Sequence, residues 1–405
     1  MWQRIENRKR LFLYGVLLTF FSLFSYKGIE EDWLTPIRFL LLCSFLVISS
    51  RHKSWKYADA NFGKYIMLFM ALPFLSMFME YVYNGQSFLS SFPLYKNFLL
   101  WSFYFVLHEL KVSQKVVIHV LTVLACIWCM IELVQQFSYP HYWFYTRGNG
   151  VDANGNATYI EIRSGIYRFM VEGYQFAMIM LFYYFQRFYN KPQVKYLFLM
   201  MVMLLGLYLY MTRQILFASL CSIVLLLIFA KNKTRWNKQV TLFTAVAILV
   251  LFLLSNIILG DELISSTKDQ LNSLDDDIRY YSFIYFLFQW QDVWCFLFGN
   301  GLPVIGTNYY EQLQEYSNWG LYLVDVGLVG ELQKYGILYI LVFISFIVYF
   351  FKYIIRKNQF YLNAYFLSTI MMSIMIFPYR IGEEFIFYSL FLYLCDLSYK
   401  EESKA

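Results

Sequence analysis

One stretch decides the fold class: two long apolar runs meet at a single arginine in YLFLMMVMLLGLYLYMTRQILFASLCSIVLLLIFA (residues 196–230). Each run is about as long as the roughly 17–25 residues that a helix needs to cross the core of a bilayer. Arg213 separates the two runs, and the link around it is too short to be a solvated loop. Charges within membrane segments usually have a function, so Arg213 is the first candidate site residue.

The same pattern recurs along the whole chain of 405 residues, of which 60% are hydrophobic and 15% are charged. A soluble chain would carry about 25% charged residues. The sequence therefore predicts an all-α polytopic membrane protein of about twelve transmembrane helices. The apolar blocks fall near residues 11–26, 33–50, 65–83, 94–110, 115–138, 169–186, 196–212, 214–230, 240–260, 336–351, 360–378 and 384–397.

Basic residues set the expected orientation, because cytoplasmic connections carry an excess of lysine and arginine. Alternate connections are basic, among them RHKSWKYADANFGK (51–64) and KNKTRWNK (231–238), so we expect both termini in the cytoplasm. The chain then divides into nine transmembrane helices with an outer loop at 139–168 (residues 1–260), a large extracytoplasmic loop with interfacial helices (261–335), and three helices with a cytoplasmic tail (336–405). Two Asn-Gly steps, followed by alternating apolar and polar residues, predict a small strand pair over 149–168.

Arginine is unevenly divided between the two sides. With this topology, 22 of the 33 basic residues are cytoplasmic and seven of these are arginine, whereas seven of the eleven outer ones are arginine. Orientation needs only positive charge, but the planar guanidinium grips phosphate or carboxylate at two points. The outer face is therefore predicted to hold an anion. For Arg38, Arg147 and Arg163, contact with lipid headgroups or a nearby acid is the simpler explanation.

Short motifs, in their order along the chain, resemble those of the bacterial O-antigen and exopolysaccharide polymerases, a family related to the O-antigen ligases. YMTRQILFASL (210–220) matches the family's arginine segment that opens a helix, and YRFMVEGYQFAMIML (167–181) matches its arginine-then-glutamate segment. DIRYYSFIYFLFQW (277–290), followed by FLFGNGLP (296–303), resembles the arginine-bearing helix and G-x-G turn. SNWGLYLVDVGLVGELQKYGIL (317–338) resembles the segment that closes the large loop.

The resemblance implies a GT-C-like arrangement in the bacterial cytoplasmic (inner) membrane. It also implies a metal-independent inverting glycosyltransferase that joins undecaprenyl-pyrophosphate-linked oligosaccharide repeats at the outer face. Its partners would be the lipid-linked donor and acceptor glycans, membrane lipid and a chain-length regulator protein, with no nucleic acid and no cofactor. The expected catalytic residues are Arg213, Arg279, Asp325 and Glu172, and the expected substrate-binding residues are Arg168, Arg380 and Glu331.

Charge building up on the departing diphosphate should dominate the barrier, and preorganised cations stabilise such charge. Arg213 and Arg279 are the first choices for gripping the diphosphate, followed by Arg168 and Arg380. Asp325, Glu172 and Glu331 are the candidates for the base that takes the acceptor proton.

Structural roles remain open for several of these residues. Arg279 could pair with Asp275 or Asp276, Arg380 could pair with Glu383 or Glu384, and Asp325 could cap a helix or form an ion pair.

Two rival functions have their own signatures. An O-antigen ligase would carry a histidine just before the closing segment, but QEYSNWG (314–320) has none, which favours the polymerase. A transporter or lipid-linked-sugar flippase would need paired halves and charges at the bilayer midplane. The four histidines and six cysteines show no metal-ligand spacing, so no metal site is expected. Aromatic residues of the outer loops, such as Tyr309 and Tyr316, could stack on sugars, although interfacial belts are the commoner explanation.

Overall fold

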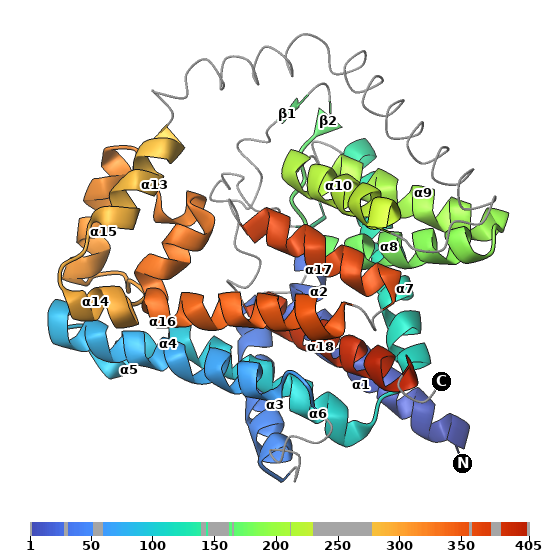
Figure 1. Ribbon diagram of the computed structural model, residues 1–405, viewed down its shortest axis with the longest axis horizontal. Helices are drawn as coiled ribbons and strands as arrows, with labels where there is room; N and C mark the ends of the chain where they lie inside the picture. Colours follow the sequence, from blue (N-terminus) through green and yellow to red (C-terminus); the bar gives the residue numbers. More distant parts are fainter. Residues whose placement is uncertain are drawn as a thin grey trace. The chain divides into compact units, whose positions relative to one another are not determined.

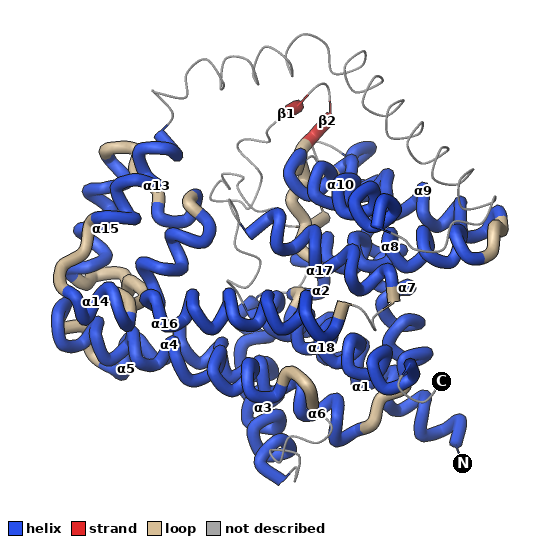
Figure 2. Tube along the Cα trace, in the orientation of Figure 1, coloured by secondary structure: helices blue, strands red, loops and turns tan. Residues whose placement is uncertain are grey.

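The structure, a computed structural model, describes residues 2–27, 31–51, 60–138, 143–144, 162–163, 166–210, 212–229, 278–355, 359–373 and 382–402. Apart from one pair of short strands, the regular structure of these residues is helical (Figure 2). A helix lies within every predicted apolar block except 240–260, which is outside the described residues. The all-α prediction is therefore confirmed for the described part of the chain.

Four described helices are long and apolar enough to cross a membrane: Trp33–Ser50, Gly63–Asn84, Gln114–Ser138 and Gly327–Lys352. Two shorter apolar helices, Val194–Leu209 and Gln214–Leu225, lie in the stretch that decides the fold class. These helices are those of a membrane protein. The full number of about twelve spans, the kind of membrane and the side of the termini stay predictions.

The chain forms two compact units, and both are discontinuous in sequence. Unit 1 consists of Met1–Phe39, Val112–Asp269 and Gln359–Met371, and unit 2 of Leu40–Lys111, Gln270–Asn358 and Met372–Ala405. Each unit thus combines segments from several of the linear divisions made from the sequence.

Unit 1 is a helical bundle in which α8 packs against α7 and α9, and α1 packs against α7. Because α8 contacts helices on more than one side, its residues 175–182 are buried all round, as the apolar sequence predicts. The helices of this unit are α1 (Trp2–Phe20), α2 (Ser22–Ser25), α7 (Gln114–Ser138), α8 (Tyr174–Asn190), α9 (Val194–Leu209), α10 (Arg213–Phe229) and most of α17 (Phe360–Ser373).

The predicted strand pair is present in unit 1. Strand β1 (Ile162–Arg163) pairs antiparallel with β2 (Ile166–Tyr167), with Ile162 opposite Tyr167. Residues 164–165 join the two strands, so neither Asn-Gly step lies between them. Both strands lie within the predicted range of 149–168, whereas the two Asn-Gly steps lie outside the described residues.

Unit 2 is built on the packing of α16 against α4, with α14 in contact with both (Figure 1). Helix α18 packs against η2 and α6. The elements of this unit are most of α3 (Glu31–Arg51), α4 (Gly63–Asn84), α5 (Phe88–Tyr95), η2 (Lys96–Ser102), α6 (Phe103–Leu110), α13 (Ile278–Phe288), α14 (Val293–Phe298), α15 (Asn308–Asn318), η4 (Leu323–Asp325), α16 (Gly327–Tyr349), η5 (Phe350–Ile354) and α18 (Gly382–Glu402).

The described part of the large loop is helical. The apolar, aromatic-rich stretch 278–298 forms α13 and α14, of 11 and 6 residues, which are separated at residues 289–292. As described, both helices are far shorter than the roughly 20 residues of a spanning helix. The Asp292 side chain accepts a hydrogen bond from the Val293 amide and starts α14.

Helix α16 is kinked at Gly336, whose φ of 77° and ψ of 173° lie outside the helical region. The kink frees the carbonyls of Gln333 and Lys334, which accept hydrogen bonds from the amides of Asn300 (2.8 Å) and Gly301 (3.0 Å) instead. The two backbones lie so close that a Cβ on Gly299 would be 2.2 Å from the Lys334 carbonyl oxygen. The G-x-G turn therefore fits into the bend of α16, backbone against backbone.

The contacts in unit 2 group the connections as alternate membrane crossing requires. At the carboxyl end of α4, Gln86 contacts Leu302 and Val304, and all three belong to segments expected on the outer side. At the amino end of α4, Asn61 contacts Asp396, and both belong to regions expected near the cytoplasm. At a rise of about 1.5 Å per residue, the 22 residues of α4 separate these two ends by about 33 Å.

Candidate functional site

The predicted site residues are distributed over both units. Arg168, Glu172 and Arg213 belong to unit 1, and Arg279, Asp325 and Glu331 belong to unit 2. Arg380 lies outside the described residues. Arg213 begins α10, Arg279 lies in α13 and Asp325 ends η4, but the side chains of these three residues are also outside the described part.

In unit 1, the segment that carries Arg168 and Glu172 is fastened along α7. The Gln136 side chain accepts a hydrogen bond from the Tyr167 amide (3.2 Å) and donates one to the Tyr167 carbonyl (2.7 Å). Further along, the Trp128 indole donates to the Val171 carbonyl at 3.2 Å. The backbone on both sides of Arg168, and the residue just before Glu172, are thus held by side chains of one helix.

Aromatic packing brings the beginning of α10 to the same region. The Tyr210 ring stacks on Tyr174, with 5.4 Å between ring centroids, and lies 5.8 Å from Trp128. Tyr210 is three residues before Arg213, and Tyr174 is two residues after Glu172. The structure therefore places the backbone of Arg213 near the segment that carries Arg168 and Glu172.

The same face of α7 carries a buried carboxyl group that sequence reasoning missed. Glu132 lies one turn from Trp128 and has an exposed fraction of 0%. Neither of its oxygens has a hydrogen-bond partner among the described residues, although the carboxyl lies close to the Val171 backbone. A charged or polar group without a partner is costly to bury, especially within a membrane helix.

Two buried amides accompany Glu132. Gln135 accepts a hydrogen bond from the Trp143 amide (3.0 Å), but its Nε2 has no partner among the described residues. The Oε1 of Gln175, at the start of α8, is buried without a described partner as well. Hydropathy hid all three residues, because each is one of a few polar positions inside an apolar block. The signal that could have revealed Glu132 is an acid within a run long enough to span a membrane.

In unit 2, the predicted site residue Glu331 is engaged inside the protein. It is 1% exposed, and its Oε1 forms an ion pair with the Nζ of Lys334, one turn later in α16, at 2.8 Å. One oxygen of this carboxyl is therefore occupied by an internal cation.

Another buried acid of unit 2, Glu80 on α4, accepts a hydrogen bond from Ser91 at 3.0 Å. Gln86 and Tyr95 then connect this network to the loop backbone at Val304 and Leu302.

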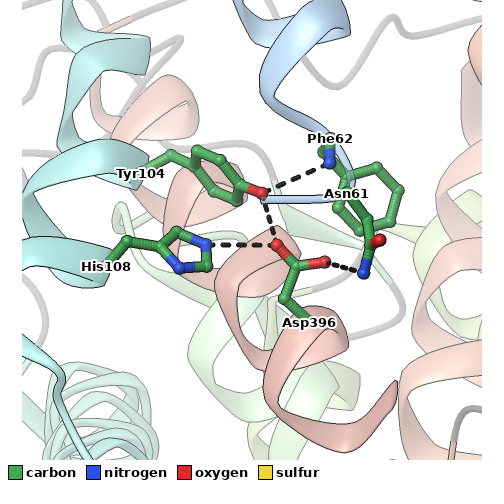
Figure 3. A network of polar contacts seen from close by, with 5 residues as sticks. All are labelled: Asn61, Phe62, Tyr104, His108 and Asp396. Carbon is green, nitrogen blue, oxygen red and sulfur yellow. Dashed lines mark hydrogen bonds and ion pairs between the residues drawn. The ribbon is translucent and has the colours of Figure 1, made fainter. Parts of the chain in front are cut away.

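The amino end of α4 holds a different kind of acidic group (Figure 3). Asp396 of α18 accepts hydrogen bonds from the side-chain Nδ2 of Asn61 (2.9 Å) and from the Tyr104 hydroxyl, and it pairs with His108 Nε2 at 3.1 Å. The Tyr104 oxygen in turn accepts from the Phe62 amide. Asp396 is 0% exposed and is surrounded by donors, as a buried carboxylate with a structural role should be. Glu132 is as deeply buried but has no described donor.

No described group of three or more His, Cys, Asp or Glu side chains has the arrangement of a metal site. Comparisons of the chain with family models, with curated proteins and with solved structures gave no match.

Proposed function

We propose that this protein is a polysaccharide polymerase that joins undecaprenyl-pyrophosphate-linked oligosaccharide repeats at the outer face of the bacterial cytoplasmic membrane. A hydroxyl oxygen of the acceptor repeat forms a bond to the anomeric carbon of the donor, on the face opposite the lipid diphosphate. The bond from that carbon to the diphosphate oxygen breaks, and the electron pair leaves with the diphosphate. The hydroxyl proton passes to a carboxylate of the protein.

The observation that carries this proposal is that the segment with Arg168 and Glu172 lies beside the beginning of α10 in unit 1. Arg168 and Glu172 lie on one segment held against α7, and Arg213 opens α10 beside it. A helix begins with its positive dipole end, so the start of α10 favours an anion. Arginines at positions 168 and 213 would add positive charge, which stabilises the charge that builds up on the leaving diphosphate.

Glu172 is the carboxylate to which we assign the acceptor proton. It is half-buried and lies on the same fastened segment as Arg168. Glu331 is the weaker candidate, since the ammonium group of Lys334 occupies one of its oxygens. Asp325 stays a candidate on the sequence pattern alone.

A second function, a proton-coupled flippase or transporter of lipid-linked sugars, is favoured by Glu132. An ionisable side chain buried in a membrane helix without a described partner is the kind of group that proton relays use. The O-antigen ligase is the remaining alternative, and the missing histidine before the closing segment weighs against it.

Reconstitution separates the two functions. The purified chain is placed in vesicles that carry lipid-linked repeats, and two products are measured: glycans longer than one repeat, and single repeats moved across the bilayer. We expect longer glycans, with Glu172→Gln slowing their formation by about 10²–10⁴, the usual contribution of general base catalysis. The matched control is Glu311→Gln, which changes an exposed acid on α15. Movement of single repeats without any chain growth would replace the polymerase with the transporter.

A further inference from the structure

We propose that a cavity in unit 2 binds an uncharged sugar residue of the glycan. The cavity is lined mainly by amides and aromatic rings, among them Gln289, Asn300, Gln312, Gln333, Tyr309 and Tyr316. None of the described residues that line it is charged. This composition disfavours a diphosphate or a divalent cation, which would be bound by arginine or by carboxylates. It suits a neutral ligand with both apolar faces and hydroxyl groups.

The orientation of one amide in this wall is fixed by its neighbours. The Nε2 of Gln333 donates to two backbone carbonyls, those of Phe286 (2.5 Å) and Gln289 (2.9 Å). Only the amide nitrogen can make these bonds, so the Oε1 of Gln333 must face the other way. It accepts a hydrogen bond from the Nδ2 of Asn300 at 2.6 Å.

Asn300 is thereby left with an acceptor of defined direction. Its side chain is 6% exposed, and its Oδ1 has no hydrogen-bond partner among the described residues. An unpaired buried carbonyl oxygen of this kind costs about 1–3 kcal/mol. A ligand that donates a hydrogen bond, such as a sugar hydroxyl or an acetamido N–H, would remove this cost. An apolar ligand would not.

The aromatic residues provide the apolar part of the site. Tyr316 packs edge-on against Tyr285, with 5.1 Å between centroids, and its hydroxyl accepts a hydrogen bond from Gln312 at 2.7 Å. Tyr309 is 5% exposed, and burial raises the pKa of its phenol well above the ordinary value, so it stays neutral. Such rings offer flat faces for the C–H groups of a sugar without adding charge.

The size of the cavity limits what enters it. Its volume of about 70 Å³ is several times the roughly 10–15 Å³ that one water needs. This is room for one edge or one substituent of a sugar ring, with the remainder of the glycan outside. Gln289 and Gln291 are exposed on the wall and mark the open side of the cavity.

This inference rests on the proposed function only for the origin of the glycan, so binding is measured without the reaction. The probe is the lipid-free repeat oligosaccharide released from the surface polysaccharide of the producing strain. Its binding to the full-length purified chain is followed by calorimetry and by saturation-transfer NMR. The test variants are Asn300→Ala and Gln312→Ala. The matched control is Gln314→Ala, which removes the same group from the same helix as Gln312 but at an exposed position outside the cavity.

We expect wild type and Gln314→Ala to bind alike, and both test variants to bind at least tenfold more weakly. Because Gln312 is only partly buried, Gln312→Ala keeps the test valid if Asn300→Ala does not fold. No binding by the wild type, or unchanged binding by a folded Asn300→Ala or by Gln312→Ala, would overturn the inference. Oligosaccharide binding without chain growth would refute the polymerase and leave the sugar site standing. Chain growth with an unchanged acceptor KM in Gln312→Ala would refute the sugar site and leave the polymerase standing.

Discussion

Asp396 and Glu132 are two carboxyl groups that are both 0% exposed, yet the structure predicts opposite effects on stability when they are replaced. Asp396→Asn removes the charge to which the Asn61 amide, the Tyr104 hydroxyl and the His108 imidazole are directed. Breaking a buried, hydrogen-bonded charge pair typically costs about 3–5 kcal/mol. We therefore expect the free energy of unfolding to fall by about this amount.

Glu132→Gln should lower the free energy of unfolding far less than Asp396→Asn, because no described hydrogen bond to the side chain is lost. Glu132→Leu should raise it by about 1–3 kcal/mol, because the leucine buries no polar atom that lacks a described partner. If Glu132→Leu stabilises the protein and also abolishes its activity, Glu132 is kept for its function at a cost in stability.

The measurement is equilibrium unfolding of the purified variants in mixed micelles, at increasing mole fractions of dodecyl sulfate, followed by tryptophan fluorescence. Asp396→Glu is a further control, since it keeps the charge and changes only the length of the side chain. If Glu132→Gln were as destabilising as Asp396→Asn, Glu132 would have a structural partner and would lose its place among the functional candidates.

Four further predictions concern the site and the topology. Arg213→Lys should insert normally but make little long-chain polysaccharide, and Arg213→Ala should make none, because removing one charge-stabilising donor costs about 10²–10³ in turnover. A wild-type chain-length ladder of surface polysaccharide from a well-expressed Arg213→Ala would show that Arg213 only contacts lipid headgroups. Polymerisation of purified lipid-linked repeats should survive excess chelator, whereas its loss with EDTA and rescue by magnesium would refute the replacement of metal by arginine. A cysteine placed by Ile305→Cys, at a side chain that is 81% exposed, should react with an impermeant maleimide added outside intact cells, and reaction only after lysis would reverse the orientation. Cys295 in the same loop should react far more slowly at pH 8 than the cysteine introduced at position 305. Burial, aided by the charge of Asp292, raises its thiol pKa to about 11 and leaves roughly 10⁻³ of the thiol as reactive thiolate at pH 8. Its reaction rate should rise steeply towards pH 11, and equal rates for the two cysteines at pH 8 would contradict its burial.

Hydropathy predicted the helices well, because a bilayer imposes a length and a composition that can be recognised in the sequence itself. It also located the strands of 162–167 within the predicted range. The break between α13 and α14 coincides with Gln289, Gln291 and Asp292, three polar residues inside an otherwise apolar stretch of sequence. The tenth span was expected near 336–351, but α16 begins earlier, at Gly327, and bends at Gly336. That bend depends on contacts with residues 297–301, more than thirty positions away.

The candidate sites were less accessible from sequence. Arginine counting drew attention to Arg168 and Arg213, because basic residues are conspicuous on the outer side. Glu132 was hidden because its importance lies in what surrounds it: a carboxyl in an apolar helix becomes unusual only when none of the described residues around it forms a hydrogen bond with it. The amide cavity was hidden for a related reason. In the sequence, Gln333 and Asn300 do not stand out. Only the structure shows that two backbone carbonyls fix the orientation of the Gln333 amide, and that this amide in turn fixes the orientation of the Asn300 side chain.

The hydrogen bonds between residues 300–301 and the kink of α16 have a consequence for how the outer region could change over time. Asn300 and Gly301 lie beside Gln333 and Lys334, so the chain leaves at Leu302 and returns at Leu332 to nearly the same place. The chain between these points, including α15 and η4, forms a loop whose two ends are joined by backbone N–H to carbonyl hydrogen bonds. These bonds do not depend on particular side chains. Segments with adjacent, anchored ends are the ones that tolerate exchange and insertion. Residues 302–326, which end before the membrane helix α16 begins at Gly327, are therefore a replaceable module, in which new side chains can be tried against new sugars while the membrane helices stay unchanged.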